Sequence, residues 1–296
     1  MNDIRIDALL PQDMAARAET LGMRKAEMPI LKMFMLAVLA GAFIALGAIF
    51  STTVAAGGIS LTGPEGSVMY TTSLPYGMRR LWMGLAFCLG LILVVVGGAE
   101  LFTGNNLIVM AWANGKVTGR ALLRNWVIVY LGNFAGAIGT VALMFFTRQY
   151  TFGGNAVGIA ALTTGVTKVN FDFIQAIALG ILCNGLVCLA IWLTYSARST
   201  MDKILSILFP ITAFVAAGFE HSVANMYFIP YALSIKYFDP EFVAAVGDQV
   251  PNLDLLTWQA FFTKNLIPVT IGNIIGGAVL VAAIYWAIFL RPVEAN

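Results

Sequence analysis

Charged side chains are scarce in this sequence, and so are the residue patterns on which most enzymes depend. Asp, Glu, Lys and Arg make up 11% of the 296 residues, whereas a soluble domain carries about 25%. The net charge of +2 is too small to indicate a nucleic-acid partner. There is one histidine, the three cysteines do not cluster, and no Gly-x-x-x-x-Gly-Lys-Ser/Thr phosphate loop occurs. We therefore expect no enzyme, no metal, no cofactor, no disulfide framework and no ATP-driven pump.

Apolar residues take the place of the missing charges. They make up 59% of the chain, and the mean hydropathy is +0.85. Charged residues from Asp3 to Lys32 precede the first long apolar stretch, so no cleavable signal peptide is expected. Six apolar stretches each exceed the roughly 20 residues needed to cross a bilayer: 33–54, 81–113, 125–147, 173–195, 204–235 and 265–290. The sequence predicts an all-α membrane protein with six transmembrane helices in contact with lipid.

Two parts of the chain repeat each other. Residues 125–136 and 265–276 share Asn, Gly-Asn and Gly at the same places. A second pair precedes it in each half, because Glu100 and Glu220 both follow glycine by two positions and both precede an asparagine by five. The repeated unit has three spans, and an odd number forces the two copies into opposite orientations, as in many transporters. We predict two inverted three-helix repeats.

The distribution of basic residues predicts the orientation. Eleven Lys and Arg residues fall on the side of the N-terminus and six on the other side, which places both termini in the cytoplasm. A helix within residues 4–31 is expected at the membrane surface, as either a gate or a passive anchor. The predicted segments are an N-terminal segment, the first repeat, an external connecting loop, the second repeat and a cytoplasmic tail, at 1–29, 30–147, 148–172, 173–290 and 291–296. Residues 55–78 and 237–264 are read as external connections.

The second and fifth apolar stretches are too long for straight helices. Each would run about 48 Å, against a hydrocarbon core of about 30 Å. Glycines at Gly98 and Gly218 predict that both helices are broken near the middle of the membrane. A helix that restarts there presents free N–H groups and a partial positive charge. Two such ends facing one cavity favour an anion over a cation.

The only histidine, His221, lies at the second break beside Glu220. An ionisable residue at this depth is a functional candidate, and histidine titrates near neutrality. It either holds an anion as imidazolium or lends a proton to the conjugate base of a weak acid. We expect Glu100 and Glu220 to hydrogen-bond the free N–H groups of their own breaks rather than to relay protons. Thr103, at the first break, donates either to a substrate or His221, or to a backbone carbonyl.

Other residues near the breaks have two interpretations. Asn184 and Asn225 are candidates for a polar lining. Asn133 and Asn273 both lie in Gly-Asn motifs, and helix packing is the favoured role for Asn133 at least. Five apolar residues either narrow the path as constrictions or simply pack: Phe87, Leu91, Leu101, Val187 and Phe214.

Three motifs in order, Gly98–Asn105, Gly218–Met226 and Asn265–Gly277, closely resemble the formate/nitrite transporter family, over about residues 29–291. The resemblance implies an aquaporin-like protomer, a homopentamer in the inner membrane, and a pore for small monovalent anions in each protomer. The run from Arg198 to Lys203 resembles formate channels in particular, whereas Gly104-Asn105-Asn106 departs from the pattern of some of them.

The resemblance also implies residue roles. His221 matches the central pore histidine, Thr103 its partner, Glu220 the acidic neighbour, and Lys168 a basic residue before the fourth span. Asn184 and Asn273 match polar residues near the path. Phe87 and Phe214 match aromatic constrictions, and the apolar slit near the cytoplasmic side corresponds to Leu91, Leu101 and Val187. The N-terminal segment matches one that closes the cytoplasmic mouth of formate channels at low pH.

The sequence therefore predicts a channel for formate or a similar anion, with protons as a possible co-substrate. A nitrite or hydrosulfide channel is the alternative within this class, and a membrane sensor or scaffold that conducts nothing is the alternative from another class. Passive and proton-coupled transport both stay open.

Overall fold

Among the residues that the structure describes, six helices are long and apolar enough to cross a membrane, as predicted. The computed structural model describes residues 7–57, 59–62, 68–72 and 74–291. Five of its spans are single helices: α2 (Ile30–Ala55), α3 (Tyr76–Gly97), α5 (Gly119–Phe146), α7 (Phe173–Ser196) and α8 (Thr200–Ala217). The sixth, Trp258–Phe289, joins α11 (Trp258–Ala260), α12 (Ile267–Ile274) and α13 (Ile284–Phe289) through two π-helices, Phe261–Leu266 and Ile275–Ala283. The chain is a multi-pass membrane protein.

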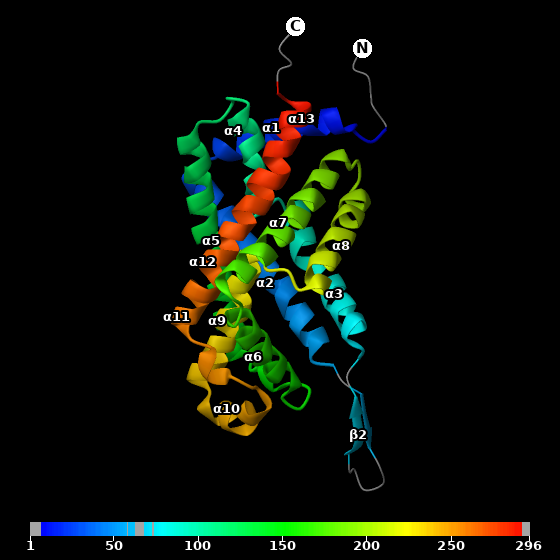
Figure 1. The fold of residues 1–296 in the computed structure, drawn as a ribbon, viewed down its shortest axis with the longest axis vertical. Coiled ribbons are helices and arrows are strands. Elements are labelled where there is room, and N and C mark those ends of the chain that lie inside the picture. Colours follow the sequence, from blue (N-terminus) through cyan, green and yellow to red (C-terminus); the bar gives the residue numbers. More distant parts are fainter. Residues whose placement is uncertain (1–6, 58, 63–67, 73, 292–296) are drawn as a thin grey trace.

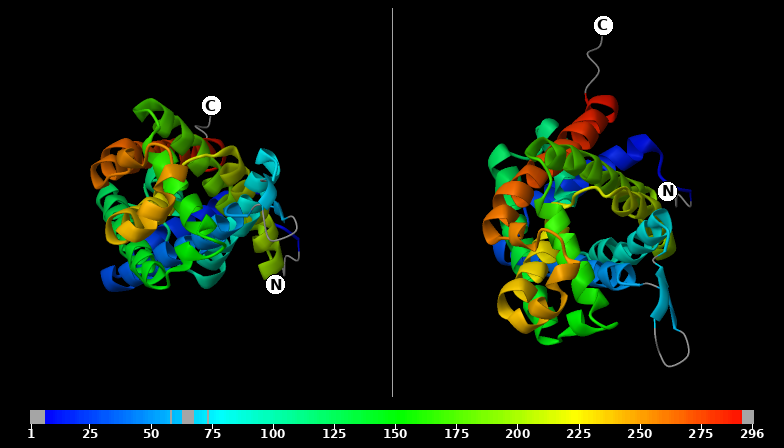
Figure 2. Two further views of the ribbon diagram at one scale, coloured as in Figure 1. Left: turned by 90° about the horizontal axis from the view of Figure 1, so that it is seen from below. Right: turned by 60° about the horizontal axis from the view of Figure 1, so that its bottom comes forward.

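The two halves of the molecule run in opposite directions. In Figure 1, α1 (Pro11–Ala26) and α13 lie at the upper end, and the hairpin of β1 (Ile59–Thr62) and β2 (Val68–Thr72) lies at the lower end. In the first half, the first span α2 descends toward the hairpin, whereas in the second half the first span α7 runs upward toward α1 and α13. Views from below and from an oblique angle show a helical bundle from which the hairpin stands apart (Figure 2). We call the two ends the α1 end and the hairpin end.

Both overlong stretches are interrupted at the glycines named above. Helix α3 ends at Gly97, Gly98 takes a φ of 74°, and the chain then continues through a 3-10 turn (Gly104–Ile108) into α4 (Val109–Ala113). Helix α8 ends at Ala217, Gly218 takes a φ of 80°, and α9 (Ser222–Phe238) follows. A left-handed glycine after the last helical residue is a common way to end a helix, because only glycine adopts that φ without strain.

The connections contain more structure than the sequence predicted. Residues 148–172, expected as a loop, hold a 3-10 turn (Gln149–Thr151) and the helix α6 (Ala156–Val169), which packs against α9. This helix was missed because its 14 residues are too short to span a membrane. Beyond α9 lie α10 (Pro240–Val246) and two 3-10 turns, at Gly247–Gln249 and Leu253–Leu255. Parts of both predicted terminal segments, 1–6 and 292–296, lie outside the described residues.

The predicted terminal helix forms as α1 and lies against the bundle. Its buried face consists of small residues and one methionine, at Met14, Ala15, Ala18, Gly22 and Ala26. This face packs against the 3-10 turn after the first break and against α4. A Cβ on Gly22 would lie 3.1 Å from the Cβ of Ala111, so the approach is close.

The repeated glycines bring helices into backbone contact. A Cβ on Gly136 of α5 would lie 2.0 Å from the carbonyl oxygen of Val38 in α2. In the second half, a Cβ on Gly276 would lie 2.1 Å from the carbonyl oxygen of Ile181 in α7. Membrane helices use small residues for such contacts because they associate through close packing.

We expect Gly136→Ala to destabilise the protein by about 2 kcal/mol or more, because the added methyl would overlap a backbone carbonyl that cannot move alone. The matched control is Gly139→Ala on the same helix, where an added Cβ meets nothing within 4 Å. Unfolding temperatures in detergent measure the difference. Equal losses in the two variants would show that the predicted contact is not a tight one.

Candidate functional site

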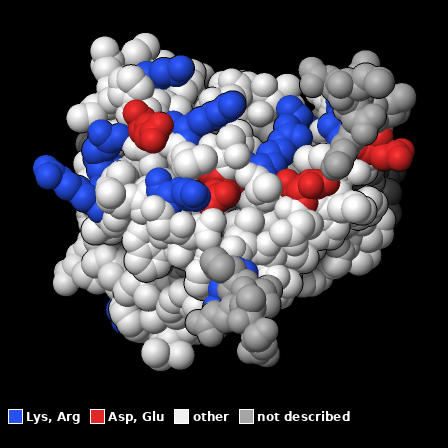
Figure 3. Space-filling view, turned by 90° about the horizontal axis from the view of Figure 1, so that it is seen from above, with Lys and Arg blue, Asp and Glu red and all other residues white. Residues whose placement is uncertain are grey.

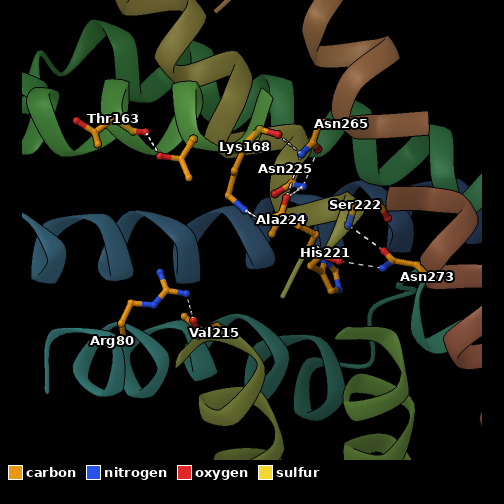
Figure 4. Close-up of polar contacts among 12 residues, drawn as sticks. Arg80, Thr163, Lys168, Val215, His221, Ser222, Ala224, Asn225, Asn265 and Asn273 are labelled. Atoms are coloured by element: carbon orange, nitrogen blue, oxygen red, sulfur yellow. Dashed lines mark hydrogen bonds and ion pairs between the residues drawn. The ribbon is translucent and has the colours of Figure 1, made fainter. Parts of the chain in front are cut away.

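The second break is held by a buried ion pair. The Glu220 carboxylate accepts hydrogen bonds from Lys168 Nζ at 2.7 Å, Asn225 Nδ2 at 2.7 Å and Asn265 Nδ2 at 3.0 Å (Figure 4). Only 2% of Glu220 is exposed. A buried carboxylate is tolerated only when it is paired and its remaining lone pairs are bonded. The predicted site residues Glu220, Asn225 and Lys168 thus form one cluster.

The first break repeats this cluster with different helices. The Glu100 carboxylate accepts from Lys25 Nζ at 2.7 Å and from Asn105 Nδ2 at 2.7 Å. Asn125 donates to the Lys25 carbonyl, as Asn265 donates to the Lys168 carbonyl. Helix α1 therefore supplies to the first break the cation that α6 supplies to the second. The predicted repeat boundaries, 30 and 173, leave both lysines outside the repeats.

The prediction that each glutamate binds the backbone N–H groups of its break is wrong, because asparagines do this instead. Asn133 Oδ1 accepts from Phe102 N at 2.9 Å, and Asn273 Oδ1 accepts from Ser222 N at 2.9 Å. The Nδ2 group of Asn273 donates to the carbonyls of Gly180 and Glu220. An amide carries both an acceptor and two donors, so it satisfies N–H and C=O groups together, whereas a carboxylate only accepts.

His221 and Thr103 meet where the two breaks come together. His221 is the N-cap of α9, and its Nδ1 accepts from the backbone N–H of Ala224 at 3.1 Å. Its Nε2 lies 3.0 Å from Thr103 Oγ1. His221 is 3% exposed and Thr103 is fully buried. Two residues 118 positions apart thus form one polar pair inside the bundle.

Aromatic rings cover this pair. The ring of Phe214 stacks on His221 with centroids 5.9 Å apart, and Phe87 meets Phe214 edge-on at 5.7 Å. Phe228, which sequence reasoning missed, stacks on Phe87 at 6.3 Å. The three remaining residues of the predicted constrictions are buried in the same apolar core: Leu91, Leu101 and Val187. Apolar side chains therefore pack around the His221–Thr103 pair.

Asn184 connects the two halves of the site. Its Nδ2 donates to the Thr103 carbonyl at 3.3 Å, to Asn106 Oδ1 at 3.2 Å and to the Asn273 carbonyl at 2.6 Å. Cys188, one turn further along α7, donates its thiol to the same Thr103 carbonyl at 3.4 Å. In this structure Asn184 holds the loop that carries Thr103, and its side chain is fully buried.

Sequence reasoning missed several residues of the two clusters. Asn125 and Asn265 are the first residues of the repeated stretches 125–136 and 265–276. Their matched positions were a signal, but no function was assigned to them. Lys25 had no such signal, because it precedes Glu100 by 75 positions whereas Lys168 precedes Glu220 by 52. Within the described part of the chain, no three His, Cys, Asp or Glu side chains lie together in a way that could hold a metal ion.

The chain is similar in sequence and in structure to known proteins. The family model described as formate/nitrite transporter matches residues 12–287. The formate channel FocA of Escherichia coli K12 is 47% identical over 290 residues, covering 98% of this chain and 97% of that protein. FocA of Haemophilus influenzae is 40% identical over 276 residues, covering 93% and 92%. A solved structure described as a pentameric formate channel with formate bound matches with a TM-score of 0.77 and 45% identity, covering 88% of this chain and 98% of that one.

The buried ion pair at the second break generates a stability prediction. We expect Lys168→Met to destabilise the protein by about 3 kcal/mol, because it leaves Glu220 charged, buried and without its cation. Adding Glu220→Gln should recover part of the loss, since an amide carries no charge. Unfolding temperatures in detergent measure both effects.

The control for this prediction is Lys264→Met, which removes an exposed lysine. If Lys168→Met and Lys264→Met unfold at the same temperature, the ion pair contributes nothing measurable to the break.

Proposed function

The chain belongs to the formate/nitrite transporter family, and on that premise we propose that it is a channel for small monovalent anions, with formate as its main substrate. One observation carries the proposal: two helix breaks bring the donor groups of His221 and Thr103 together behind a pair of phenylalanine rings. The relatives above are named as formate channels, which favours formate within the class of small anions.

The proposed path has two kinds of section. At its centre an anion meets the Thr103 hydroxyl, the His221 Nε2 group and the positive N-terminal end of α9. On either side it meets apolar side chains, among them Phe87 and Phe214, where a charge is poorly solvated. Such a path passes a small ion or its neutral acid and rejects larger polar solutes.

The hydrogen bonds of His221 support a specific protonation scheme. A nitrogen that accepts a hydrogen bond carries no proton, so Nδ1, which accepts from Ala224, is bare. The neutral ring then carries its proton on Nε2 and donates to Thr103 or to an anion in its place. Forming the imidazolium requires a proton on Nδ1, which ends the cap on α9. In this proposal the ring first takes up a proton on Nδ1, which loosens the first turn of α9. Giving one proton to formate returns the ring to its neutral form, and the cap forms again when the remaining proton is on Nε2.

The assembly and the orientation belong to the same proposal. We infer a homopentamer from the relative that is described as pentameric. We infer an inner-membrane location with the α1 end in the cytoplasm. Several Lys and Arg side chains gather on this end, with acidic ones between them (Figure 3). Its exposed cations include Arg24, Lys32, Lys116, Arg120 and Arg124, as expected for a cytoplasmic face.

Replacement of His221 tests the mechanism. His221→Ala removes both the helix cap and the titrating group, and we expect roughly a hundredfold loss of formate flux into proteoliposomes at neutral pH, the lower end of the usual range for a single positioned proton donor. His221→Asn keeps a good cap residue without a group that titrates, so it should fold like the wild type but lose the pH dependence of flux. Radiolabelled formate uptake at several pH values is the measurement.

Two results would contradict this proposal. Unchanged flux and pH response in both variants would remove His221 from the mechanism. No anion conductance in wild-type proteoliposomes would favour a sensor or scaffold. Competition of nitrite and hydrosulfide against labelled formate separates formate from the rival substrates.

A further inference from the structure

The second break exposes the wrong end of a helix to an anion. Helix α8 stops at Ala217, four residues before His221, so its last carbonyl groups lie next to the proposed path. The C-terminal end of a helix carries about half a negative charge and up to four unpaired carbonyls. Unless another group balances it, this end repels the anion that the N-terminal end of α9 attracts.

Arg80 of α3 supplies the balancing charge. Its Nε donates to the carbonyl of Ala216 at 3.1 Å, and its Nη2 donates to the carbonyl of Val215 (Figure 4). These bonds use two of the five N–H donors of a guanidinium, and the side chain is half-buried. Gly218 leaves room for it, since a Cβ there would lie 3.2 Å from Nη2.

Arg80 also stands in line with the aromatic constriction. It precedes Phe87 by seven positions on the same helix, so the two share one face of α3, with Arg80 roughly 10 Å nearer the hairpin end. The residue that it contacts, Val215, follows directly after Phe214. A cation with unused donors therefore lies just outside the ring pair that covers His221.

The first break is built differently on its own side. Where α3 ends, a cavity of about 310 Å³ opens toward the α1 end, lined by Arg17, Lys25, Gly98 and Lys203 among others. Among the described residues, no side chain donates to the last carbonyls of α3 as Arg80 does to those of α8. The partial negative charge at the end of α8 is therefore balanced by direct contact with Arg80, whereas that at the end of α3 faces basic residues across a cavity.

We propose that Arg80 determines anion entry from the hairpin end: it cancels the negative end of α8 and offers its unused N–H groups to an anion approaching Phe87 and Phe214. The inference rests on the proposed function, because it concerns the same path. It assigns to Arg80 a part in capture and not in the events at His221.

Formate uptake into right-side-out and inside-out membrane vesicles tests the proposal, because each preparation presents one entrance. Arg80→Gln should raise the half-saturating formate concentration roughly tenfold at the hairpin end. This is the size expected for losing a unit charge about 10 Å from an anion at the Phe87–Phe214 ring pair. Its effect at the α1 end should stay below about twofold. Arg80→Lys should restore most of the wild-type value, since it keeps the charge.

The matched control is Arg148→Gln. Arg148 also lies toward the hairpin end, but its side chain is 66% exposed and pairs with Asp239, so its loss should leave both half-saturation values unchanged. Elution volume and unfolding temperature show whether each variant keeps its assembly and fold.

Each other outcome overturns a different claim. A lower maximal flux with unchanged half-saturation would make Arg80 a structural cap only, and equal defects in Arg80→Gln and Arg80→Lys would remove charge from the explanation. Either result overturns this inference and leaves the proposed function standing. Absence of formate uptake by the wild type would instead overturn the proposed function.

Discussion

The structure depends on satisfying backbone groups that two broken helices leave unpaired inside a membrane. A bilayer offers no water to bond them, so the protein itself must do so. Asn133 and Asn273 each accept one N–H and donate to two carbonyls, of which one belongs to the break and one to a neighbouring helix. The breaks are thereby fixed to the rest of the bundle, and the groups next to them take defined positions.

The two breaks share this support but differ at the centre. The residue after Glu100 is Leu101, whereas the residue after Glu220 is His221. Two positions further along, Thr103 in the first copy corresponds to Val223 in the second. Each copy thus contributes one polar side chain where its twin has an apolar one, and the two polar side chains meet. The supporting clusters stay alike because both breaks have the same backbone to satisfy, while the chemistry depends on the difference.

Sequence reasoning succeeded where a local pattern carries the information. The six spans follow from apolar length, and the breaks follow from glycine within stretches too long for one helix. His221 stood out as an ionisable residue at membrane depth. The repeated motifs could not show which cations pair with Glu100 and Glu220, because Lys25 and Lys168 approach them from helices outside those motifs. Lys168 was expected only from the family resemblance, and Lys25 was not expected at all. Arg80 was counted only among the six basic residues on the side of the membrane opposite the N-terminus. Nothing in its local sequence shows that it reaches the end of a helix more than a hundred residues away.

The position of Lys25 has a consequence for anyone who shortens or tags this protein. Helix α1 lies at one end of the molecule and could be taken for a segment that is safe to remove. However, the Lys25 ammonium group on this helix pairs with the carboxylate of Glu100, a residue that is 4% exposed. Deleting the segment through Lys25 would expose one end of the molecule and would also leave the Glu100 carboxylate at the first break without its cation. A clipped version would therefore differ from the intact one in its electrostatics as much as in its shape, and a Lys25→Met protein of full length is the comparison that separates the two effects.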